Sequence, residues 1–190
     1  MSATAPDRLH FTGNDKADRL LAEEPLALLI GFALDQQVPM QKAFSGPLEL
    51  KRRLGALDAG AIAAMDPARL EEVFREKPAL HRFPTSMAGR TQELCAVIAD
   101  EYGGDAARVW SEAADGADLE RRLRGLPGFG EMKVRSLTAV LGKRLGVRPP
   151  GWEDVAATHF CLGDVDSPVK LAEYQAAKRA HKAAMRAESA

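Results

Sequence analysis

Residues that favour β-strands are scarce in this chain. Val, Ile and Thr are sparse, few segments alternate between apolar and polar positions, and Ala, Leu, Arg and Glu dominate the 190 residues. A sheet would need several short runs of strand-forming residues with a period of two. The composition therefore argues against a sheet and predicts an all-α fold.

Cysteine is also rare, with only Cys95 and Cys161 in the chain. Neither has another Cys or a His at metal-ligand spacing, and the four histidines show no partner spacing either. This pattern excludes a readable zinc site or iron–sulfur cluster, so we expect no metal held by side chains. Two unpaired cysteines fit a reducing cytoplasm.

Long apolar runs are missing. The longest covers residues 25–34, which is too short to span a bilayer, and the N-terminus lacks a basic segment followed by an apolar one. We therefore expect no membrane association and no export, and the length favours a single domain. The net charge of -1 excludes a uniformly basic surface, so any affinity for a polyanion must come from local patches.

Helix-start and helix-stop residues divide the chain into short helices. Asn14 can cap a helix up to residue 23, and Pro25 can begin a buried one up to residue 35. Gly46-Pro47 is expected to bend or end a helix over residues 40–54. Asp66 as a cap before Pro67 predicts the start of a helix over residues 68–75. Further helices are expected over residues 87–102, 105–114, 119–124, 131–145 and 168–187, with a short one after Pro149-Pro150-Gly151.

The sequence Leu126-Pro127-Gly128-Phe129-Gly130 lies directly before one of these helices. Its glycines permit close backbone approach, so nearby amides and the positive end of the helix can face outward together. Such an arrangement binds phosphate. Leu126 and Phe129 are expected to sink between the two flanking helices. Residues 121–148 also hold eight Lys or Arg and a single acid, Glu131, which is informative in a chain of net charge -1.

This segment resembles the helix-hairpin-helix (HhH-GPD) DNA glycosylase superfamily. Leu-Pro-Gly-Phe-Gly-Glu-Met-Lys is similar to the family's hairpin, and a Gly/Pro loop at residues 146–151 and then acidic residues follow it. Upstream, LIGFALDQQVPMQKAF at residues 29–44 resembles the early helix–turn–helix of the alkylpurine-type branch. MAGRTQELCAVIADEYGGD resembles the helix before the hairpin. The similarity covers about residues 26–154.

The resemblance implies a compact, two-lobed helical fold in one domain, residues 1–190. One lobe would be a helical barrel over about residues 38–130, including the start of the hairpin. The other would combine residues 1–37 with residues 146–190.

The activity that the resemblance implies is base-excision repair, by hydrolysis of the N-glycosidic bond of a damaged or mispaired base. Bifunctional members also use a Lys that forms a Schiff base. In the family this Lys is the sixth residue after the hairpin Leu, which here is Met132. Lys133 lies one residue further, and one helical step rotates a side chain by about 100°. We therefore expect a monofunctional enzyme without lyase activity, in which Lys133 meets phosphate or solvent.

The acid that such a reaction needs has several candidates. Asp154 is the first Asp after the Gly/Pro loop, although its separation from the hairpin is slightly longer than in the family. Val165-Asp166-Ser167-Pro168-Val169 instead resembles the Val-Asp-Thr-x-Val that begins the family's catalytic helix, and Asp164 lies two residues earlier. An Asp or Ser before Pro also caps ordinary helices. The sequence leaves Asp154, Asp164 and Asp166 as alternatives for one acid.

The remaining site residues follow from what base flipping requires. Gln36 and Gln37 are expected at a turn that faces DNA, where their amides fill the gap left by a flipped base. Trp152, Met132 and Phe44 are expected to line the base pocket, since stacking holds a flipped base. The full expected DNA-binding set is Leu126, Pro127, Gly128, Phe129, Gly130, Lys133, Arg135, Gln36 and Gln37.

The expected partner is double-stranded DNA that contains a lesion, bound by a cytoplasmic monomer that associates with the nucleoid during repair. No cofactor is expected beyond an alkali cation, Na⁺ or K⁺, which hairpins of the family often hold on their carbonyl oxygens. A rival hypothesis is a catalytically inactive DNA-binding or lesion-sensing protein, and a third is a helical interaction domain that never touches DNA. The sequence does not specify which base is excised.

Overall fold

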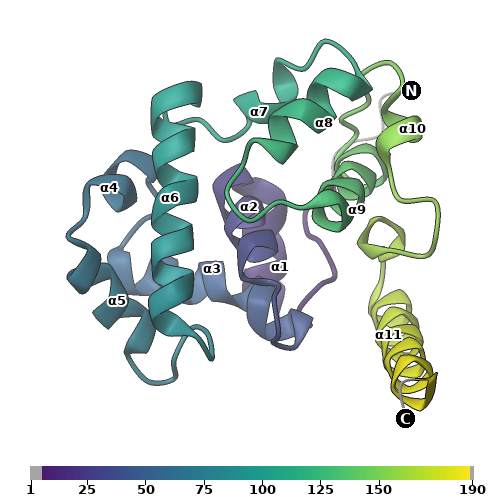
Figure 1. The fold of residues 1–190 in the computed structure, drawn as a ribbon, viewed down its shortest axis with the longest axis horizontal. Helices are drawn as coiled ribbons and strands as arrows, with labels where there is room; N and C mark the ends of the chain where they lie inside the picture. The colour runs from purple at the N-terminus through teal and green to yellow at the C-terminus, as the bar shows by residue number, and fades with distance from the viewer. Residues whose placement is uncertain (1–5, 189–190) are drawn as a thin grey trace.

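The computed structural model describes residues 6–188, which form an all-helical fold (Figure 1). These residues contain eleven α-helices and one short 3-10 helix, and none of them belongs to a strand. The first six helices are α1 (Asp15–Glu23), α2 (Pro25–Leu34), α3 (Met40–Leu54), α4 (Ala59–Ala64), α5 (Pro67–Arg75) and α6 (Pro84–Tyr102). The others are α7 (Arg108–Ser111), α8 (Gly116–Arg124), α9 (Glu131–Lys143), α10 (Trp152–Val155), η1 (Leu162–Asp164) and α11 (Pro168–Glu188).

Helix α2 is buried along almost its whole length and packs against α1, α3 and α6. A helix that is apolar all round needs such cover on every side. Phe44 of α3 is fully buried beside it and packs edge-on against Phe11 and Phe32, with both pairs of ring centroids 5.1 Å apart. Phe44 is therefore a core residue, and the expectation that it lines a base pocket is not met.

Helix α3 approaches α2 closely at Gly46. A Cβ at this position would lie 2.6 Å from Cδ1 of Leu34, so any larger residue would push the two helices apart. Helix α3 covers the expected residues, Met40–Leu54, and of the two expected effects of Gly46-Pro47 an end of the helix is excluded, because Pro47 lies inside it. Pro47 removes one helical hydrogen bond, and its burial offsets that loss.

Several elements differ from the expected helices; α8, for example, begins at Gly116 rather than at residue 119. The short helix α4 was not expected; Asp58 caps it by accepting a hydrogen bond from the Ala61 amide at 2.7 Å. Helix α6 begins at Pro84 rather than at residue 87, and α7 covers one turn instead of residues 105–114. Asn14 and Asp66 cap α1 and α5 as predicted.

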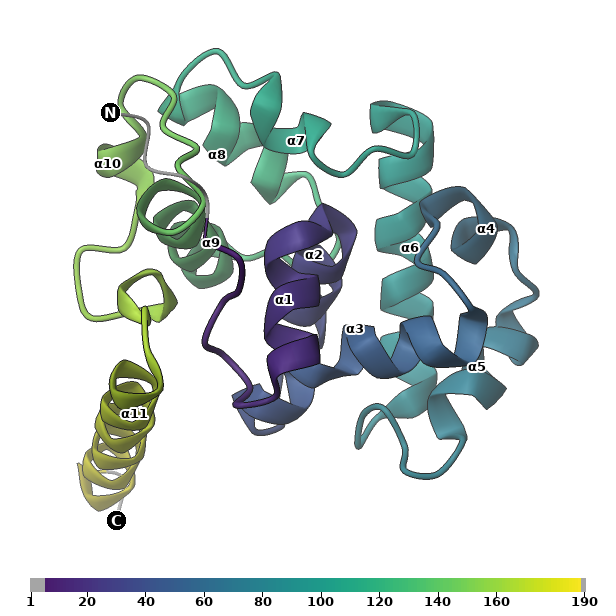
Figure 2. The same cartoon turned by 180° about the vertical axis from the view of Figure 1, so that it is seen from behind.

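The packing divides the helices differently from the expected lobes. Helices α1 and α2 pack mainly on α3 and α6, and α6 packs on α4 and α5, so α1 to α6 form one group. Helices α7 to α10 and η1 form a second group around α9, seen on the opposite side of the molecule from α4 and α5 (Figures 1 and 2). One hydrophobic cluster runs through both groups, from Leu9 to Leu171.

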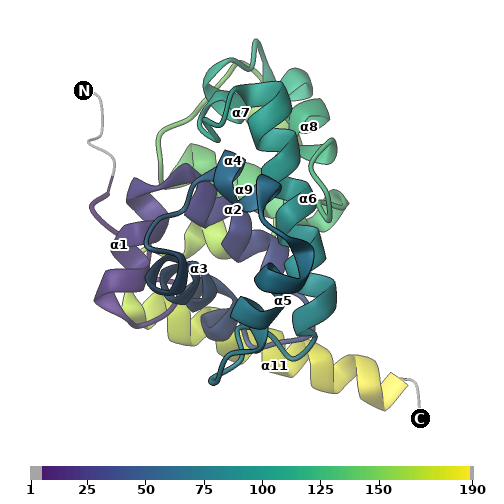
Figure 3. The same ribbon diagram turned by 90° about the vertical axis from the view of Figure 1, so that its left-hand side faces the viewer.

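Helix α11 extends away from the rest of the described chain (Figure 3). Leu171 is its single buried residue among those described. Tyr174 is half-buried and stacks edge-on with Phe160. No described helix combines the length and apolar character that a membrane crossing requires.

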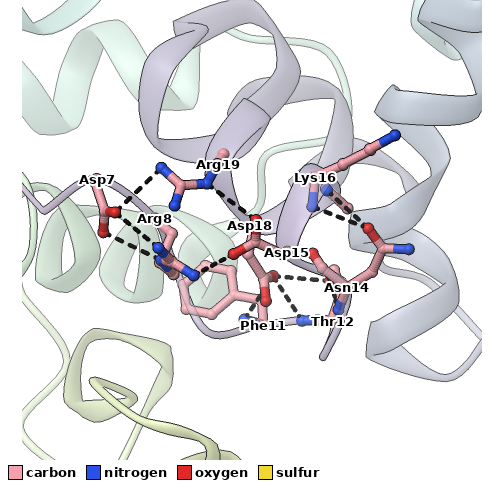
Figure 4. A network of polar contacts seen from close by, with 10 residues as sticks. Asp7, Arg8, Phe11, Thr12, Asn14, Asp15, Lys16, Asp18 and Arg19 are labelled. Carbon is pink, nitrogen blue, oxygen red and sulfur yellow. Dashed lines mark hydrogen bonds and ion pairs between the residues drawn. The ribbon is translucent and has the colours of Figure 1, made fainter.

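The segment before α1 is held by a buried carboxylate, that of Asp18 (Figure 4). Its Oδ1 accepts hydrogen bonds from the Phe11 amide at 3.1 Å, the Thr12 amide at 2.9 Å and the Thr12 hydroxyl at 2.8 Å. The Asp18 carbonyl also accepts the Leu9 amide. These bonds place Leu9 and Phe11 in the core.

Replacing Asp18 by Ala should therefore lower the free energy of unfolding by about 2–3 kcal/mol, because buried donors lose a charged acceptor. Urea unfolding followed by circular dichroism measures this change. Asp15→Ala is the matched control, since Asp15 lies on the same helix but forms only exposed ion pairs with Arg8 and Arg19. An equal loss in both variants would contradict the role given to Asp18.

Candidate functional site

An open, shallow depression of about 620 Å³ lies beside the predicted hairpin. Four parts of the chain build its wall: the turn after α2, the middle of α6, the end of α8, and the hairpin with the first turn of α9. The lining residues are Gln36, Arg90, Arg124, Leu126, Gly128, Phe129, Gly130, Glu131, Met132 and Lys133. The turn and the hairpin, which are far apart in sequence, therefore meet at one surface.

The hairpin has the backbone that the sequence predicted. Leu126 and Phe129 are buried, and the Phe129 amide donates to the Leu126 carbonyl at 3.1 Å. Gly128 has φ +82°, a conformation that favours glycine. Gly130 is the N-cap of α9, and no described side chain caps this helix. The first amides of α9 are therefore open to an anion.

Arg90 of α6 links the turn after α2 to the hairpin, and sequence reasoning did not find it. Its guanidinium donates to Oε1 of Gln36. Its aliphatic part passes over Gly128, where a Cβ would lie 2.7 Å from Arg90 Cδ. The absence of a side chain at Gly128 thus allows Arg90 to reach Gln36. No local pattern marks Arg90, because its importance comes from two distant segments.

The turn at Gln36 and Gln37 is tight and is held by His81. Gln37 is exposed and has φ +57°, a region that non-glycine residues rarely adopt. Nδ1 of His81 accepts the Phe83 amide at 3.1 Å, so Nε2 carries the hydrogen and donates to the Gln36 carbonyl at 2.9 Å. Burial lowers the pKa of His81 and keeps the ring neutral. The sequence analysis had assigned no role to this histidine.

Lys133, which was expected to meet phosphate or solvent, lies at the depression. It is half-buried, lines the depression, and its Nζ lies 3.3 Å from the Ala33 carbonyl oxygen at the end of α2. Burial lowers the pKa of Lys133; the nearby Asp35 carboxylate opposes this shift and Arg90 adds to it. Lys133 therefore belongs to the wall of the depression.

Asp35 is a second residue that the sequence analysis missed. It follows α2 directly, is half-buried, and interacts electrostatically with Lys133 and with Lys178 of α11. Burial raises the pKa of Asp35, and the two lysines offset only part of that shift. Tyr174 lies near it, and the pKa of Tyr174 is raised to about 12 by burial and then by Asp35. The sequence did hold one signal for Asp35, because an acidic residue directly after a wholly apolar helix stands out from its neighbours.

None of the three predicted aspartates lines the depression. Asp154 is exposed on α10, and Asp166 is exposed before α11, 3.9 Å from Arg144. Asp164 has a structural role, because it accepts hydrogen bonds from Nζ of Lys143 at 2.6 Å and from the Cys161 amide at 3.0 Å. Burial acts to raise the pKa of Asp164, but these hydrogen bonds outweigh it and the pKa is lowered.

Of the predicted base-pocket residues, only Met132 borders the depression, and it is 68% exposed. Trp152 lies elsewhere and packs over Gly142 of α9, where a Cβ would overlap its ring. It also covers a small apolar cluster that includes Ala139 and Cys161. Trp152 thus holds α10 against α9.

The positive charge near the hairpin is partly neutralised. Arg135 lies 3.8 Å from Glu131. Acids outside the hairpin also pair with its basic residues: Arg121–Asp118, Arg122–Asp118, Arg124–Glu120, Lys143–Asp164 and Arg144–Asp166. The more exposed of these pairs, such as Arg124–Glu120, are weak, so exchanging their carboxylate for a phosphate changes the free energy little.

Within residues 6–188, no three His, Cys, Asp or Glu side chains gather as a metal site would require. The alkali cation on the hairpin carbonyls remains a prediction.

No protein-family model matches the chain, and neither a curated protein nor a solved structure shows significant similarity to it. The glycosylase resemblance therefore rests on the residues themselves.

The lowered pKa of His81 predicts how stability depends on pH. The unfolded state takes up a proton near pH 6.5, above the pKa of the folded state, so it binds more protons in that range. The free energy of unfolding should thus fall as the pH decreases below about 6.5. His81→Gln should remove part of this slope, whereas His181→Gln, a change of an exposed residue on α11, should keep it. Urea titrations between pH 5 and pH 8 would contradict the assignment if the two variants behaved alike.

Proposed function

We propose that this protein binds damaged double-stranded DNA through the hairpin and removes a base from it, as a base-excision DNA glycosylase. The observation that carries the proposal is the uncapped start of α9, which opens onto the same depression as Gln36, Arg90 and Lys133. Open amides and cationic side chains bind phosphate, and a hollow beside them suits a nucleotide turned out of the duplex.

Each part of the depression then has a role. The amides at Gly130 and Glu131 hold a backbone phosphate, with Arg124 beside them. The Gln36 and Gln37 amides fill the gap in the duplex, and their strained turn is kept in place by His81 and Arg90. Met132 offers an apolar surface to the displaced nucleotide.

Asp35 is the acid that we assign to the reaction: it does not itself line the depression, but it interacts electrostatically with Lys133, which does. Water attacks C1′ of the sugar, the electron pair of the N-glycosidic bond leaves with the base, and Asp35 accepts the proton of the water. That proton finally reaches the departing base. A raised pKa makes a carboxylate a better proton acceptor at neutral pH.

Replacing Gly128 by Ala should weaken duplex binding about tenfold, because the new Cβ displaces Arg90 from the hairpin. Gly104→Ala is the matched control: Gly104 has φ +83° at the end of α6, but nothing lies within 4 Å of a Cβ there. Both variants carry about 1–2 kcal/mol of backbone strain. Fluorescence anisotropy with a labelled duplex, at several salt concentrations, compares them.

Wild-type binding should weaken steeply with salt, as phosphate contacts require. Binding that ignores salt and is equal in both glycine variants would exclude the hairpin as the DNA-binding element.

Base release is the direct test of catalysis. The protein is incubated with duplexes that each carry one lesion or mismatch, and alkali then cleaves any abasic site. On the duplex that reacts, Asp35→Asn should slow release at least about 100-fold, as expected for loss of a general base. Asp100→Asn, an exposed change on α6, is the control and should react like the wild type. A loss in Asp166→Asn with Asp35→Asn unaffected would instead assign the acid to Asp166.

A second candidate function is a DNA-binding or lesion-sensing protein without catalysis. The observation that favours it is the position of Asp154, Asp164 and Asp166, all away from the wall of the depression. Salt-dependent, hairpin-dependent binding without release of any base from the panel would support this alternative.

A further inference from the structure

Positive charge gathers on the second half of α11. Residues 175–188 hold four Lys or Arg and a single acid, Glu188. The four cations are all exposed: Lys178, Arg179, Lys182 and Arg186. Lys170, nearer the start of the helix, pairs with Glu173 at 2.6 Å, but no carboxylate of the described chain forms an ion pair with any of the four. Their charge is therefore open to an anionic partner.

Three of these cations continue the side of α11 that packs against the rest of the protein. Leu171 is buried, and Lys178, Lys182 and Arg186 follow it by 7, 11 and 15 residues. At about 100° per residue, these steps bring all three to within about 60° of the direction of Leu171. These three residues form the cationic line of α11. The same side of the helix is thus apolar where the protein covers it and cationic where the helix extends beyond that cover.

The start of the cationic line adjoins the depression. Tyr174 packs edge-on against Phe160 with ring centroids 5.8 Å apart, and Nζ of Lys178 lies 5.5 Å from the centroid of the Tyr174 ring. Lys178 also interacts electrostatically with Asp35, which directly follows α2. The hairpin crosses α2 on the side that faces the viewer in Figure 1, and the far end of α11 projects toward the same side (Figures 1 and 3). A long ligand in the depression would therefore continue along α11.

We propose that α11 is a second phosphate-binding element, which holds the duplex beside the lesion while the hairpin holds it at the lesion. The inference rests on the proposed function, because the hairpin must fix the duplex over the depression. The cationic line spans eight residues from Lys178 to Arg186, about 12 Å along the helix. Phosphates of one strand follow each other every 3.4 Å or so along the duplex axis, so the line covers about three to four nucleotides.

The composition of α11 favours nucleic acid over a lipid surface as the partner. Helices that lie on membranes combine a basic face with a face of large apolar residues such as Trp, Phe or Leu. After Tyr174, the apolar residues of the described helix are alanines and Met185. Such a face has little area to bury in a bilayer, whereas contact with a phosphate backbone needs mainly charge.

The test changes the charge at the far end of α11 and compares it with an equal change elsewhere. Lys182→Gln/Arg186→Gln removes two exposed positive charges and keeps residues that favour helices. Lys16→Gln/Arg69→Gln removes two exposed positive charges from α1 and α5, and α5 lies at the opposite edge of the molecule from α11 (Figure 1). The probe is a labelled duplex of about two helical turns, roughly 20 base pairs, with one abasic site. Fluorescence anisotropy measures its affinity at several salt concentrations.

The α11 variant should bind this duplex at least about tenfold more weakly at about 0.1 M salt. The slope of log affinity against log salt should fall in magnitude by about 1.8, since each lost phosphate contact contributes about 0.9. The control should keep the slope and stay within about threefold of the wild-type affinity. Lys182→Arg/Arg186→Lys, which retains both charges, should bind like the wild type. Hydroxyl-radical footprinting should show protection on one side of the abasic site that only the α11 variant loses.

Base release separates this inference from the proposed function. With the protein in saturating excess over the duplex that reacts, the α11 variant should release the base at the wild-type rate, because its changes lie away from the reacting sugar. Base release with an unchanged affinity, salt slope and footprint would overturn the role of α11 and leave the glycosylase intact. Charge-dependent binding of anionic vesicles, with duplex binding unaffected, would instead assign the cationic line to a membrane. Duplex binding that is weakened in the α11 variant but not in Gly128→Ala would support α11 and overturn the role of the hairpin.

Discussion

The burial of α2 is the constraint on which the rest of the structure depends. Its residues from Leu26 to Leu34 are all buried, so helices on every side must cover it, and the chain can return to the surface only beyond its last turn. The first residues to do so are Asp35 and Gln36. Because the same helix end meets the hairpin, the acid and the amide arrive beside Lys133 and Arg90. The polar chemistry of the depression is thus a consequence of how an apolar helix ends.

Small residues set the distances within this arrangement. Gly46 lets α3 lie close to α2, and Gly128 lets Arg90 cross the hairpin toward Gln36. A Cβ at Gly46 would displace the Leu34 side chain of α2, and a Cβ at Gly128 would displace the Arg90 side chain. His81 adds a directional constraint, because its two ring nitrogens tie the turn to the loop before α6. The depression is consequently held by contacts from elements that are distant in sequence.

The sequence was sufficient for features that depend on local chemistry. Asn14 and Asp66 cap helices where predicted, and Leu126 and Phe129 are buried around the Gly128 turn, because caps and turns depend on a few neighbouring residues. Features that depend on packing were missed. Phe44 was expected to line a base pocket but lies in the core. Whether Gly46-Pro47 would bend or end the helix over residues 40–54 also depended on packing, and Pro47 is accommodated inside α3, where it is buried. Arg90 carries no local signal of its role, because its partner Gln36 lies 54 residues earlier in the chain. Asp35 is marked only by its place at the end of an apolar helix, and its partner Lys133 lies 98 residues later.

Lys133 shows how the length of a side chain adds to what a position along a helix predicts. Counting residues from the hairpin Leu places Met132 at the reactive position and turns Lys133 away. A lysine side chain is long and flexible, however: Lys133 lines the depression, and its amine lies 3.3 Å from the Ala33 carbonyl oxygen at the end of α2. The amine then belongs to one group of helices and the Asp35 carboxylate to the other. The electrostatic interaction between the amine and the carboxylate therefore depends on how closely α9 packs against the end of α2. The electrostatics of the site thus depend on the packing that joins the two groups of helices.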